Sequence, residues 1–325
     1  MPERLHSSLH PEHPPHRLTK MKIGFIGLGI MGKPMCRNLL NAGYELLVCG
    51  RNPASVDELV AAGATSAPTP RDVAAQVGMV ITMLPDSPEV KQVVLGPDGV
   101  IEGAQPGCTV ADMSSIAPLA SREIAARLAE NGIEMLDAPV SGGQPKAVDG
   151  TLSVMVGGKQ EVFDRCLPVL EAMAASVVRV GDIGAGNVAK LANQVVVALN
   201  IAAVAEAMVL AAKAGVEPDL VYQAIRGGLA GSAVMDAKVP LMLDRKFDPG
   251  FRINLHIKDL ANALETSHEV GAPLALTDSV MAIMQALKAD GLGDCDHGAM
   301  IRHFEKRAEI ELKRSASSLI TGFPK

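Results

Sequence analysis

A glycine-rich segment near the start of the chain has the residue types and spacing of a phosphate-binding loop. It follows a short apolar run at 23–26, precedes a helix-like stretch at 33–42, and reads Gly27, Leu28, Gly29, Ile30, Met31, Gly32. In such a loop the first glycine makes a tight turn, the second lets the backbone approach a pyrophosphate, and the third lets the helix pack on the strand. The free N–H groups at the start of the helix then face the anion. This context predicts dinucleotide binding over the alternative, an ordinary glycine-rich turn.

Lys190 and Asn193 are a second group that could do chemistry. They are three residues apart in a long apolar stretch, so on a helix they project from one face. The ordinary explanation of such a pair is a lysine that extends to solvent beside a satisfied core amide. The alternative is a reaction site. When a carbonyl is reduced, negative charge builds on its oxygen, and a lysine can supply both a cation and a proton.

A third candidate is the sequence Ser141-Gly142-Gly143, which follows Pro139 directly after a strand-like run. A glycine pair exposes successive backbone N–H groups without side-chain obstruction, and such groups can form a nest for a carboxylate. The residues alone fit a tight turn equally well, so both interpretations stay open at this point.

The elements that must position these candidates fall into two kinds. From Met21 to about Ile183, strand-like apolar runs alternate with helical stretches; the runs span residues 23–26, 46–49, 79–84, 109–113, 135–138, 153–156 and 177–180. This alternation predicts an α/β domain with a doubly wound, Rossmann-type sheet. Beyond Gly186 the strand signal ends, and long helical patterns interrupted by glycine and proline predict an all-α second domain.

The second domain is expected to be built on a long apolar helix at about residues 185–214. This stretch is apolar around most of its circumference, so it must be covered on nearly all sides. A central core helix meets that need, and so does a helix covered by a second subunit of a homodimer or homotetramer. Asn200 and Glu206 interrupt the stretch, which makes it a poor membrane span.

Four segments are expected along the chain. Residues 1–20 form a disordered tail, residues 21–183 the dinucleotide-binding domain, residues 184–312 the helical substrate and dimerisation domain, and residues 313–325 a flexible tail. The first tail carries histidines among prolines but no apolar stretch that could drive its ordering. Nothing fixes those histidines in a ligand geometry, so no metal site is predicted.

The composition of the chain excludes several classes of function. The 325 residues carry a net charge of −6 and no tryptophan, whereas a nucleic-acid surface needs a basic patch and stacking aromatics. The five cysteines are scattered and odd in number, which suits reduced thiols. No apolar core of a secretory signal is present near the start. We therefore expect a cytoplasmic protein without nucleic-acid or membrane partners.

Five motifs occur along the chain in a fixed order, at residues 24–32, 112–115, 137–143, 186–194 and 256–260. By these motifs the chain resembles the β-hydroxyacid dehydrogenases, the family related to 3-hydroxyisobutyrate dehydrogenase. The resemblance extends from Met21 to about His303. Five ordered motifs are together far more specific than the glycine pattern alone.

The resemblance implies a role for each candidate at the substrate. Lys190 is expected to be the catalytic general acid, and Asn193 is expected to orient the substrate. The segment Ser141, Gly142 and Gly143 is expected to bind the substrate carboxylate. Asn187 and Gln194, within the fourth motif, are weaker candidates.

The resemblance also implies contacts with the cofactor. Lys258 is expected to lie near the nicotinamide, with Asp259 helping to hold it and to close the domain cleft. Ser115 is expected to make a nicotinamide-side contact at the carboxyl end of a strand, where ligands of open sheets bind. The crevice there is expected to be lined by Met83, Leu84 and Pro85.

The end of the second predicted strand departs from the family pattern. No acid stands in the segment 48–52, where one would hydrogen-bond the adenosine ribose, and closely similar members often carry aspartate in place of Gly50. Loss of the carboxylate removes repulsion of a 2′-phosphate, and Arg51, followed by Asn52, offers that phosphate a bidentate partner. We expect NADP or NAD and favour NADP. The alternative is a surface arginine with NAD in use.

The family resemblance carries an expected activity. The chain looks most like the members that reduce tartronate semialdehyde (2-hydroxy-3-oxopropanoate) to D-glycerate, which implies an NAD(P)H-dependent enzyme with a small carboxylated aldehyde as substrate. A 3-hydroxyisobutyrate or other short-chain β-hydroxyacid dehydrogenase stays open, because such discrimination depends on pocket contacts. A non-catalytic dinucleotide-binding module is the alternative from another class. Intact Lys190 and Asn193 argue against that module.

Overall fold

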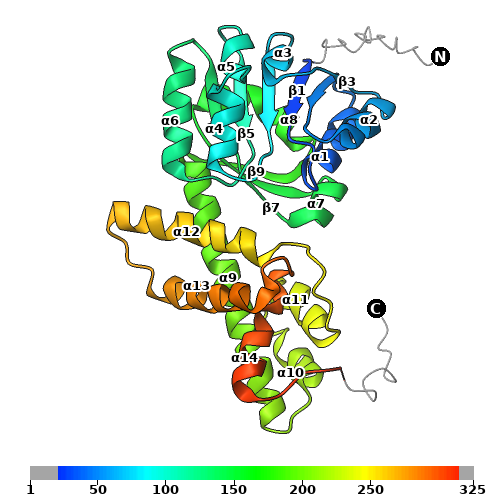
Figure 1. Cartoon of the computed structure of the whole chain (residues 1–325), viewed down its shortest axis with the longest axis vertical. Coiled ribbons are helices and arrows are strands. Elements are labelled where there is room, and N and C mark those ends of the chain that lie inside the picture. The colour runs from blue at the N-terminus through cyan, green and yellow to red at the C-terminus, as the bar shows by residue number, and fades with distance from the viewer. Residues whose placement is uncertain (1–20, 315–325) are drawn as a thin grey trace, which may run out of the picture.

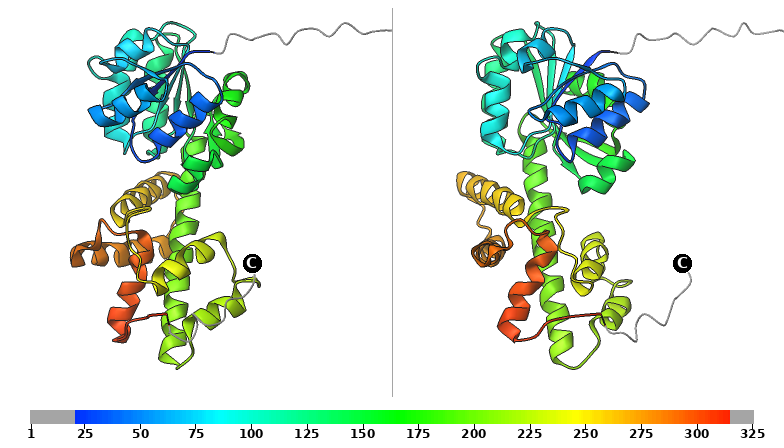
Figure 2. Two further views of the ribbon diagram at one scale, coloured as in Figure 1. Left: turned by 90° about the vertical axis from the view of Figure 1, so that its right-hand side faces the viewer. Right: turned by 45° about the vertical axis from the view of Figure 1, so that its right-hand side comes forward.

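The computed structural model of the protein describes residues 21–314, arranged as a sheet domain and a helical domain (Figure 1). The tail predicted for residues 1–20 lies outside the described residues, as does the part of the second tail at 315–325. One long helix leaves the sheet domain and runs through the helical domain, as the two turned views also show (Figure 2). The predicted fold class is confirmed, whereas the domain boundaries stay a prediction.

A single nine-stranded sheet forms the first domain, in the order β3-β2-β1-β4-β5-β6-β8-β7, with β9 beside β8. Its strands are β1 (Ile23–Ile26), β2 (Leu46–Cys49), β3 (Thr65–Ser66), β4 (Met79–Thr82), β5 (Thr109–Asp112), β6 (Glu134–Asp137), β7 (Val140–Ser141), β8 (Leu152–Gly157) and β9 (Ala174–Gly181). Pairing is parallel from β3 through β6, and β8 runs antiparallel to β6 and β7. Since strand order reverses at β1, the crevice at the carboxyl ends of β1 and β4 is where a ligand of such a sheet binds.

Helices cover both faces of this sheet. They are α1 (Gly32–Asn41), α2 (Pro53–Ala61), α3 (Pro70–Ala74), α4 (Ser87–Leu95), α5 (Val100–Gly103), α6 (Pro118–Ala129), α7 (Gly143–Asp149) and α8 (Gln160–Glu171). Along β4, Met79 and Ile81 belong to the core cluster that contains α1 and α8, whereas Val80 belongs to the cluster that contains α4 and α6. Successive strand residues point to opposite faces, so both faces of a central strand are buried and its sequence is continuously apolar.

The structure corrects two details of the predicted strands. The run expected at residues 79–84 ends at Thr82, because Met83 and Leu84 leave the sheet as the loop at its carboxyl edge. Strands β3 and β7 were not predicted. Each is two residues long, which is too short to show an alternating pattern.

The described part of the second domain consists of helices joined by loops, and its one β-type pairing is an isolated bridge between Arg252 and Asp296. Its helices are α9 (Ala185–Lys213), α10 (Pro218–Ile225), α11 (Ala233–Leu243), α12 (Ile253–Val270), α13 (Ala275–Leu287) and α14 (Ile301–Ala308), with short irregular turns at Lys288–Leu292 and His297–Met300. Helix α9 packs against β8 and β9 at one end and against all five other helices along its length. This explains why α9 is apolar around most of its circumference.

Among residues 21–314, α9 is the one helix long and apolar enough to cross a membrane by length and composition. Its contacts with the sheet and with five helices make it the core helix of the second domain. Coverage is incomplete, however, since Val196 is 57% exposed and Leu210 is 71% exposed. The prediction that a second subunit shares this helix therefore stays open.

Candidate active site

The glycine loop between β1 and α1 has the geometry that its pattern predicts. Gly27 has a positive φ of 106°, and a Cβ there would lie 2.2 Å from the Met83 carbonyl oxygen. A Cβ on Gly32 would lie 1.9 Å from the Gly27 carbonyl oxygen, so this glycine lets the helix approach the turn. A Cβ on Gly29 would meet no protein atom within 4 Å. Packing therefore does not require Gly29, and the residues present fit a dinucleotide whose pyrophosphate approaches the backbone there.

The other members of the loop differ in exposure. Leu28 is buried, Ile30 is 52% exposed, and Met31 immediately precedes the first turn of α1. No acidic side chain lies in that first turn, so nothing on the helix repels an anion at its amino end. These three residues can contribute backbone groups to the predicted cofactor site, and Leu28 also has a packing role.

That packing role accounts for the unusual residue at the end of β2. A Cβ on Gly50 would lie 2.9 Å from Cδ1 of Leu28, so a side chain at position 50 requires Leu28 to move. Arg51 is exposed, and its guanidinium has no hydrogen bond or ion pair with another described residue. Asn52 has a local role, because its side chain accepts a hydrogen bond from Ala54 N at 3.1 Å and caps α2. The structure thus leaves Arg51 available to bind an anion, whereas the capping of α2 explains the presence of Asn52 without a cofactor contact.

A buried carboxylate that was not recognised as a site residue supports the loops after β4 and β5. Asp112 Oδ1 accepts hydrogen bonds from Thr82 Oγ1 at 2.7 Å and Ser114 Oγ at 2.5 Å. Ser114 Oγ in turn accepts from Leu84 N at 2.9 Å. Burial raises the pKa of Asp112 to about 6 despite these hydrogen bonds. These hydrogen bonds hold the segment 83–85 against the segment 114–115. The prediction that Met83, Leu84 and Pro85 line the same crevice as Ser115 requires this arrangement.

Lys258 joins the two domains at this crevice. From α12 its amino group donates hydrogen bonds to the carbonyl oxygens of Pro85 at 3.0 Å and Ser115 at 2.5 Å. It also lies 3.0 Å from Asp259 Oδ1 as an ion pair. The structure therefore brings together Lys258, Asp259, Pro85 and Ser115, four residues predicted to contact or support the cofactor.

A second buried carboxylate fixes the start of α9. Asp137 ends β6, and its two oxygens accept hydrogen bonds from Gly184 N and Asn187 N, each at 2.7 Å. Burial raises the pKa of Asp137 to about 7, although these N–H groups oppose the increase. Asn187 is fully buried and also bonds Ile116 N and Ser121 Oγ. Its amide is satisfied by the protein, which favours a structural role for this weaker candidate.

The predicted substrate residues meet across the two domains. Ser141 lies at the end of β7, and its Oγ donates to Oδ1 of Asn193 on α9 at 3.3 Å. Gly142 and Gly143 follow with positive φ values of 127° and 65°. Two successive residues of this conformation turn their backbone N–H groups away from regular pairing, which suits a nest for a carboxylate.

Lys190 lies one turn before Asn193 on the same helix and is only 7% exposed. Its amino group makes no hydrogen bond or salt bridge with another described residue. Burial lowers its pKa to about 8, helped by the charge of Lys258 and opposed by that of Asp259. A partly desolvated ammonium with a pKa near neutrality can give up and regain a proton readily, as a general acid must.

Gln194, a weaker candidate from the sequence, occupies the centre of a buried hydrogen-bond chain. Its Oε1 accepts from Asn193 Nδ2 at 2.9 Å, and its Nε2 donates to Asp259 Oδ2 at 2.6 Å. The spacing of residues 193 and 194 places them on different sides of a helix, so sequence periodicity gave no reason to connect them. The connection appears only because α12 brings Asp259 beside α9.

Sequence reasoning also missed a buried histidine pair behind this chain. His256 Nδ1 lies 3.0 Å from His297 Nδ1, and His256 Nε2 lies 3.2 Å from the carbonyl oxygen of Gln194. Burial lowers the pKa of His256 to about 4 and lowers that of His297 well below its usual value. Both rings are therefore neutral near pH 7. Within residues 21–314 no group of three or more His, Cys, Asp or Glu side chains could hold a metal ion.

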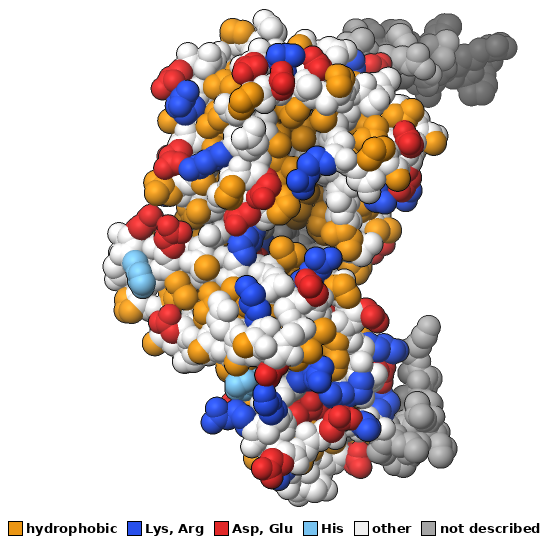
Figure 3. Space-filling view, in the orientation of Figure 1, with side chains coloured by type: hydrophobic (Ala, Val, Ile, Leu, Met, Phe, Trp, Pro, Cys, Tyr) orange, Lys and Arg blue, Asp and Glu red, His pale blue; other side chains and the backbone are white. Residues whose placement is uncertain are grey.

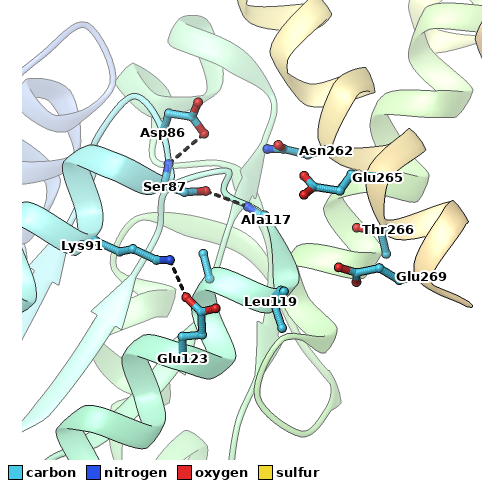
Figure 4. A pocket seen from close by; sticks show the side chains of 11 residues that line it. Asp86, Ser87, Lys91, Ala117, Leu119, Glu123, Asn262, Glu265, Thr266 and Glu269 are labelled. Atoms are coloured by element: carbon cyan, nitrogen blue, oxygen red, sulfur yellow. Dashed lines mark hydrogen bonds and ion pairs between the residues drawn. The ribbon is translucent and has the colours of Figure 1, made fainter.

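The surface is hollowed where the two domains meet (Figure 3). Further along α12 a cavity of about 380 Å³ separates this helix from α4 and α6, and its polar lining includes Asp86, Lys91, Glu123, Glu265 and Glu269 (Figure 4). Lys91 pairs with Glu123. The remaining carboxylates would repel a dinucleotide or a carboxylated substrate. The cavity contains none of the predicted site residues and is separate from the candidate site.

Both halves of the chain match known protein families. Residues 22–181 match the family described as the NAD binding domain of 6-phosphogluconate dehydrogenase. Residues 184–304 match the family described as NAD-binding of NADP-dependent 3-hydroxyisobutyrate dehydrogenase. The two matches meet close to the start of α9.

Individual relatives match over nearly their whole length. The 2-hydroxy-3-oxopropionate reductase of Escherichia coli (strain K12) is 42% identical over 292 residues, which are 90% of this chain and 100% of the relative. The 2-(hydroxymethyl)glutarate dehydrogenase of Eubacterium barkeri is 38% identical, over 90% of this chain and 97% of the relative. The solved structure of a Mycobacterium tuberculosis 3-hydroxyisobutyrate dehydrogenase with L-serine aligns with a TM-score of 0.81 and 33% identity, over 87% of this chain and 99% of that one.

Proposed function

The chain belongs to the family of β-hydroxyacid dehydrogenases related to 3-hydroxyisobutyrate dehydrogenase, and from that premise we propose that it reduces tartronate semialdehyde to D-glycerate. The observation that carries the proposal is the position of Lys190, buried and without a hydrogen-bond partner among the described residues, one turn from Asn193 and its contact with Ser141. A cation placed beside a carboxylate-binding loop suits a substrate with an acid group near its carbonyl.

The residues of the chain divide the work of the reaction. The loop Ser141-Gly142-Gly143 binds the substrate carboxylate, and Asn193 orients the carbon skeleton. When bound along the glycine loop, NADPH or NADH supplies the hydride that adds to the aldehyde carbon. Lys190 stabilises the negative charge that develops on the carbonyl oxygen and then donates its proton there, so that the product is an alcohol and the lysine is left neutral.

The names of the relatives support a shared substrate chemistry. In hydroxymethylglutarate, 3-hydroxyisobutyrate and L-serine, the carbon that bears the hydroxyl is bonded directly to the carbon that carries a carboxylate. In 2-hydroxy-3-oxopropionate the aldehyde carbon has this position. A fixed span between the carboxylate loop and Lys190 selects this spacing. A short-chain β-hydroxyacid dehydrogenase with another substrate, 3-hydroxyisobutyrate among them, is accordingly the second candidate.

Three finer points belong to the same proposal. The cofactor is NADPH in preference to NADH, because Arg51 is exposed without a partner among the described residues and no acid stands at position 50. The protein acts in the cytoplasm. It forms a homodimer or homotetramer that covers the exposed residues of α9, among them Val196 and Leu210, and light scattering of the purified protein measures that state.

The test of the proposed function is a substrate panel. Loss of NADH and NADPH absorbance is followed in parallel with tartronate, methylmalonate and succinate semialdehydes. Preferred turnover of tartronate semialdehyde supports the proposed reaction, and the ratio of the two cofactors ranks them. Activity confined to methylmalonate semialdehyde favours the second candidate. No turnover of any aldehyde contradicts an enzymatic role on these substrates and favours the binding module.

A further inference from the structure

One chain of hydrogen bonds links the substrate loop to the cofactor side of the site. Ser141 Oγ donates to Asn193 Oδ1, Asn193 Nδ2 donates to Gln194 Oε1, and Gln194 Nε2 donates to Asp259 Oδ2, over distances of 3.3, 2.9 and 2.6 Å. The other oxygen of Asp259 lies 3.0 Å from the Lys258 amino group. Gln194 is 4% exposed and Asp259 is 1% exposed, so water does not compete at the centre of the chain.

The donor-to-acceptor direction of these hydrogen bonds follows from the chemistry of the Asp259 carboxylate, at which they end. An ionised carboxylate only accepts hydrogen bonds, so Gln194 must turn its NH₂ group toward Asp259. The carbonyl oxygen of Gln194 then faces Asn193, which must donate a hydrogen bond to it from its own NH₂ group. Asn193 is left with its carbonyl oxygen toward Ser141. One buried negative charge thereby fixes the orientation of two amides that could otherwise each adopt two orientations.

The same carboxylate holds the cofactor side. Through its ion pair it keeps Lys258 in place, and Lys258 binds the carbonyl oxygens of Pro85 and Ser115 in the sheet domain. Asp259 is therefore shared between the lysine that bridges the domains and the amide that leads to the substrate loop. Both contacts are to one buried side chain, so a substitution of Asp259 alters the positions of both Lys258 and Gln194.

We propose that Gln194 and Asp259 are positioning residues, which set the orientation of the Asn193 amide at the substrate and couple it to the closure of the domains by Lys258. The proposal rests on the proposed function, in which Asn193 orients the substrate. Gln194 touches neither the reacting atoms nor the carboxylate loop. Gln194 acts through Asn193, and it contributes to substrate binding by holding the Asn193 amide in one orientation.

Charged and titratable groups near these hydrogen bonds come from three helices and a turn, and Lys238 of α11 acts on both buried histidines. Lys190 projects from α9, Lys258 and His256 from α12, and His297 from the turn behind His256. Burial lowers the pKa of His256 to about 4 and lowers that of His297 well below its usual value, which moves the titration of both rings away from the range between pH 6 and 8. A change that appears in this range after substitution of Gln194 comes from the substituted side chain or from Lys190, whose pKa burial lowers to about 8.

Two substitutions of Gln194 separate orientation from space filling. Gln194→Met keeps the volume but removes both hydrogen bonds, so we expect KM for the aldehyde to rise about tenfold at every pH, with a smaller change in kcat. Gln194→Glu places a new carboxyl against Asp259, which raises the pKa of that carboxyl. Near pH 6 the protonated form donates to Asp259 and accepts from Asn193, as glutamine does. We expect a deficit in kcat/KM of about tenfold or more at pH 8 that shrinks to about threefold or less at pH 6.

Thermal unfolding gives a readout that needs neither substrate nor cofactor. The new carboxyl of Gln194→Glu has a higher pKa in the folded than in the unfolded protein, so its stability relative to wild type increases as pH falls from 8 to 6. The difference between Gln194→Met and wild type stays constant over this range. Asn200→Asp is the matched control, because among residues 21–314 the Asn200 amide binds only the Val196 carbonyl oxygen of its own helix.

The outcomes are distinct. Equal deficits of both Gln194 variants at pH 6 and pH 8, in activity and in melting temperature, overturn the proposal, because Gln194 then only fills space. Recovery at pH 6 in both readouts supports it. If the wild-type protein turns over no aldehyde while the pH-dependent stability is observed, the proposed function is rejected and the fixed orientation of the amides is kept.

Discussion

The two halves of the candidate site are built by opposite means. In the sheet domain the loop after β1 offers backbone, and its key positions are glycines where a side chain would collide or obstruct. In the helical domain α9 and α12 offer polar side chains, of which Lys190, Gln194 and Asp259 are buried and Asn193 and Lys258 are partly buried. A backbone site depends on local conformation, whereas a site of buried charges depends on which elements pack together.

This difference predicts how each half responds to substitution. A change in the backbone half alters packing and cofactor affinity, because the glycines serve the turn and the close approach of a ligand. A change in the side-chain half alters rate and its pH dependence, because those groups carry charge and protons. Four measurements test that division.

The largest effect is expected from Lys190→Ala. Removal of the proposed general acid should lower kcat for aldehyde reduction by about a hundredfold to ten-thousandfold and leave the Kd for NADPH unchanged. Stopped-flow turnover and fluorescence titration measure the two quantities. Lys213→Ala, at the exposed carboxyl end of the same helix, is the control. Unchanged turnover of Lys190→Ala would remove the lysine from the mechanism.

A matched pair of glycine substitutions tests the backbone half. Gly32→Ala forces a Cβ to within 1.9 Å of the Gly27 carbonyl oxygen, so it should lower the free energy of unfolding by about 3 kcal/mol. Gly29→Ala has open space for its Cβ and should leave stability within about 0.5 kcal/mol of wild type while weakening NADPH binding about tenfold. Denaturant unfolding and cofactor titration measure the two quantities. Equal destabilisation by both would deny Gly29 its separate role.

The pH dependence of reduction tests the side-chain half. Burial lowers the pKa of Lys190 to about 8. In the proposed reaction the acid form of this lysine donates a proton to the carbonyl oxygen, and the cofactor supplies the hydride. The rate should be constant below about pH 8 and fall about tenfold per pH unit above it. Asp259 opposes the lowering of that pKa, so Asp259→Asn should move the fall to lower pH. A profile that does not move with this substitution would separate Asp259 from Lys190.

The smallest effect is expected at the edge of the backbone half. Arg51→Ala should weaken NADPH binding about fivefold and leave NADH binding nearly unchanged, because only NADPH carries the 2′-phosphate that a guanidinium binds. The exposed arginine has no partner among the described residues, so its removal should cost little stability. Equal weakening of both cofactors would assign Arg51 a contact that does not involve this phosphate.

Much of the backbone half could be predicted because its signals are local. The apolar run before Gly27 and the helical pattern after Gly32 define strand, turn and helix within twenty residues, and their bounds differ by one residue or less from the prediction. The use of Gly50 could not be predicted. A glycine fits at position 50 because Leu28, twenty-two residues earlier in the chain, packs against it. The pairing of β1 with β2 creates that contact.

The sequence by itself determined the alternation of seven strands with helices, the glycine turn, the apolar central helix and the spacing of Lys190 and Asn193. Each depends on the nature and period of neighbouring residues, which are properties of the chain. Tertiary structure alone decided that Gln194 connects Asn193 to Asp259, that Lys258 reaches Pro85 and Ser115, and that burial lowers the pKa of Lys190. These features depend on distance and desolvation between elements far apart in sequence. Such quantities exist only once α12 has packed on α9 and the helical domain has packed on the sheet domain.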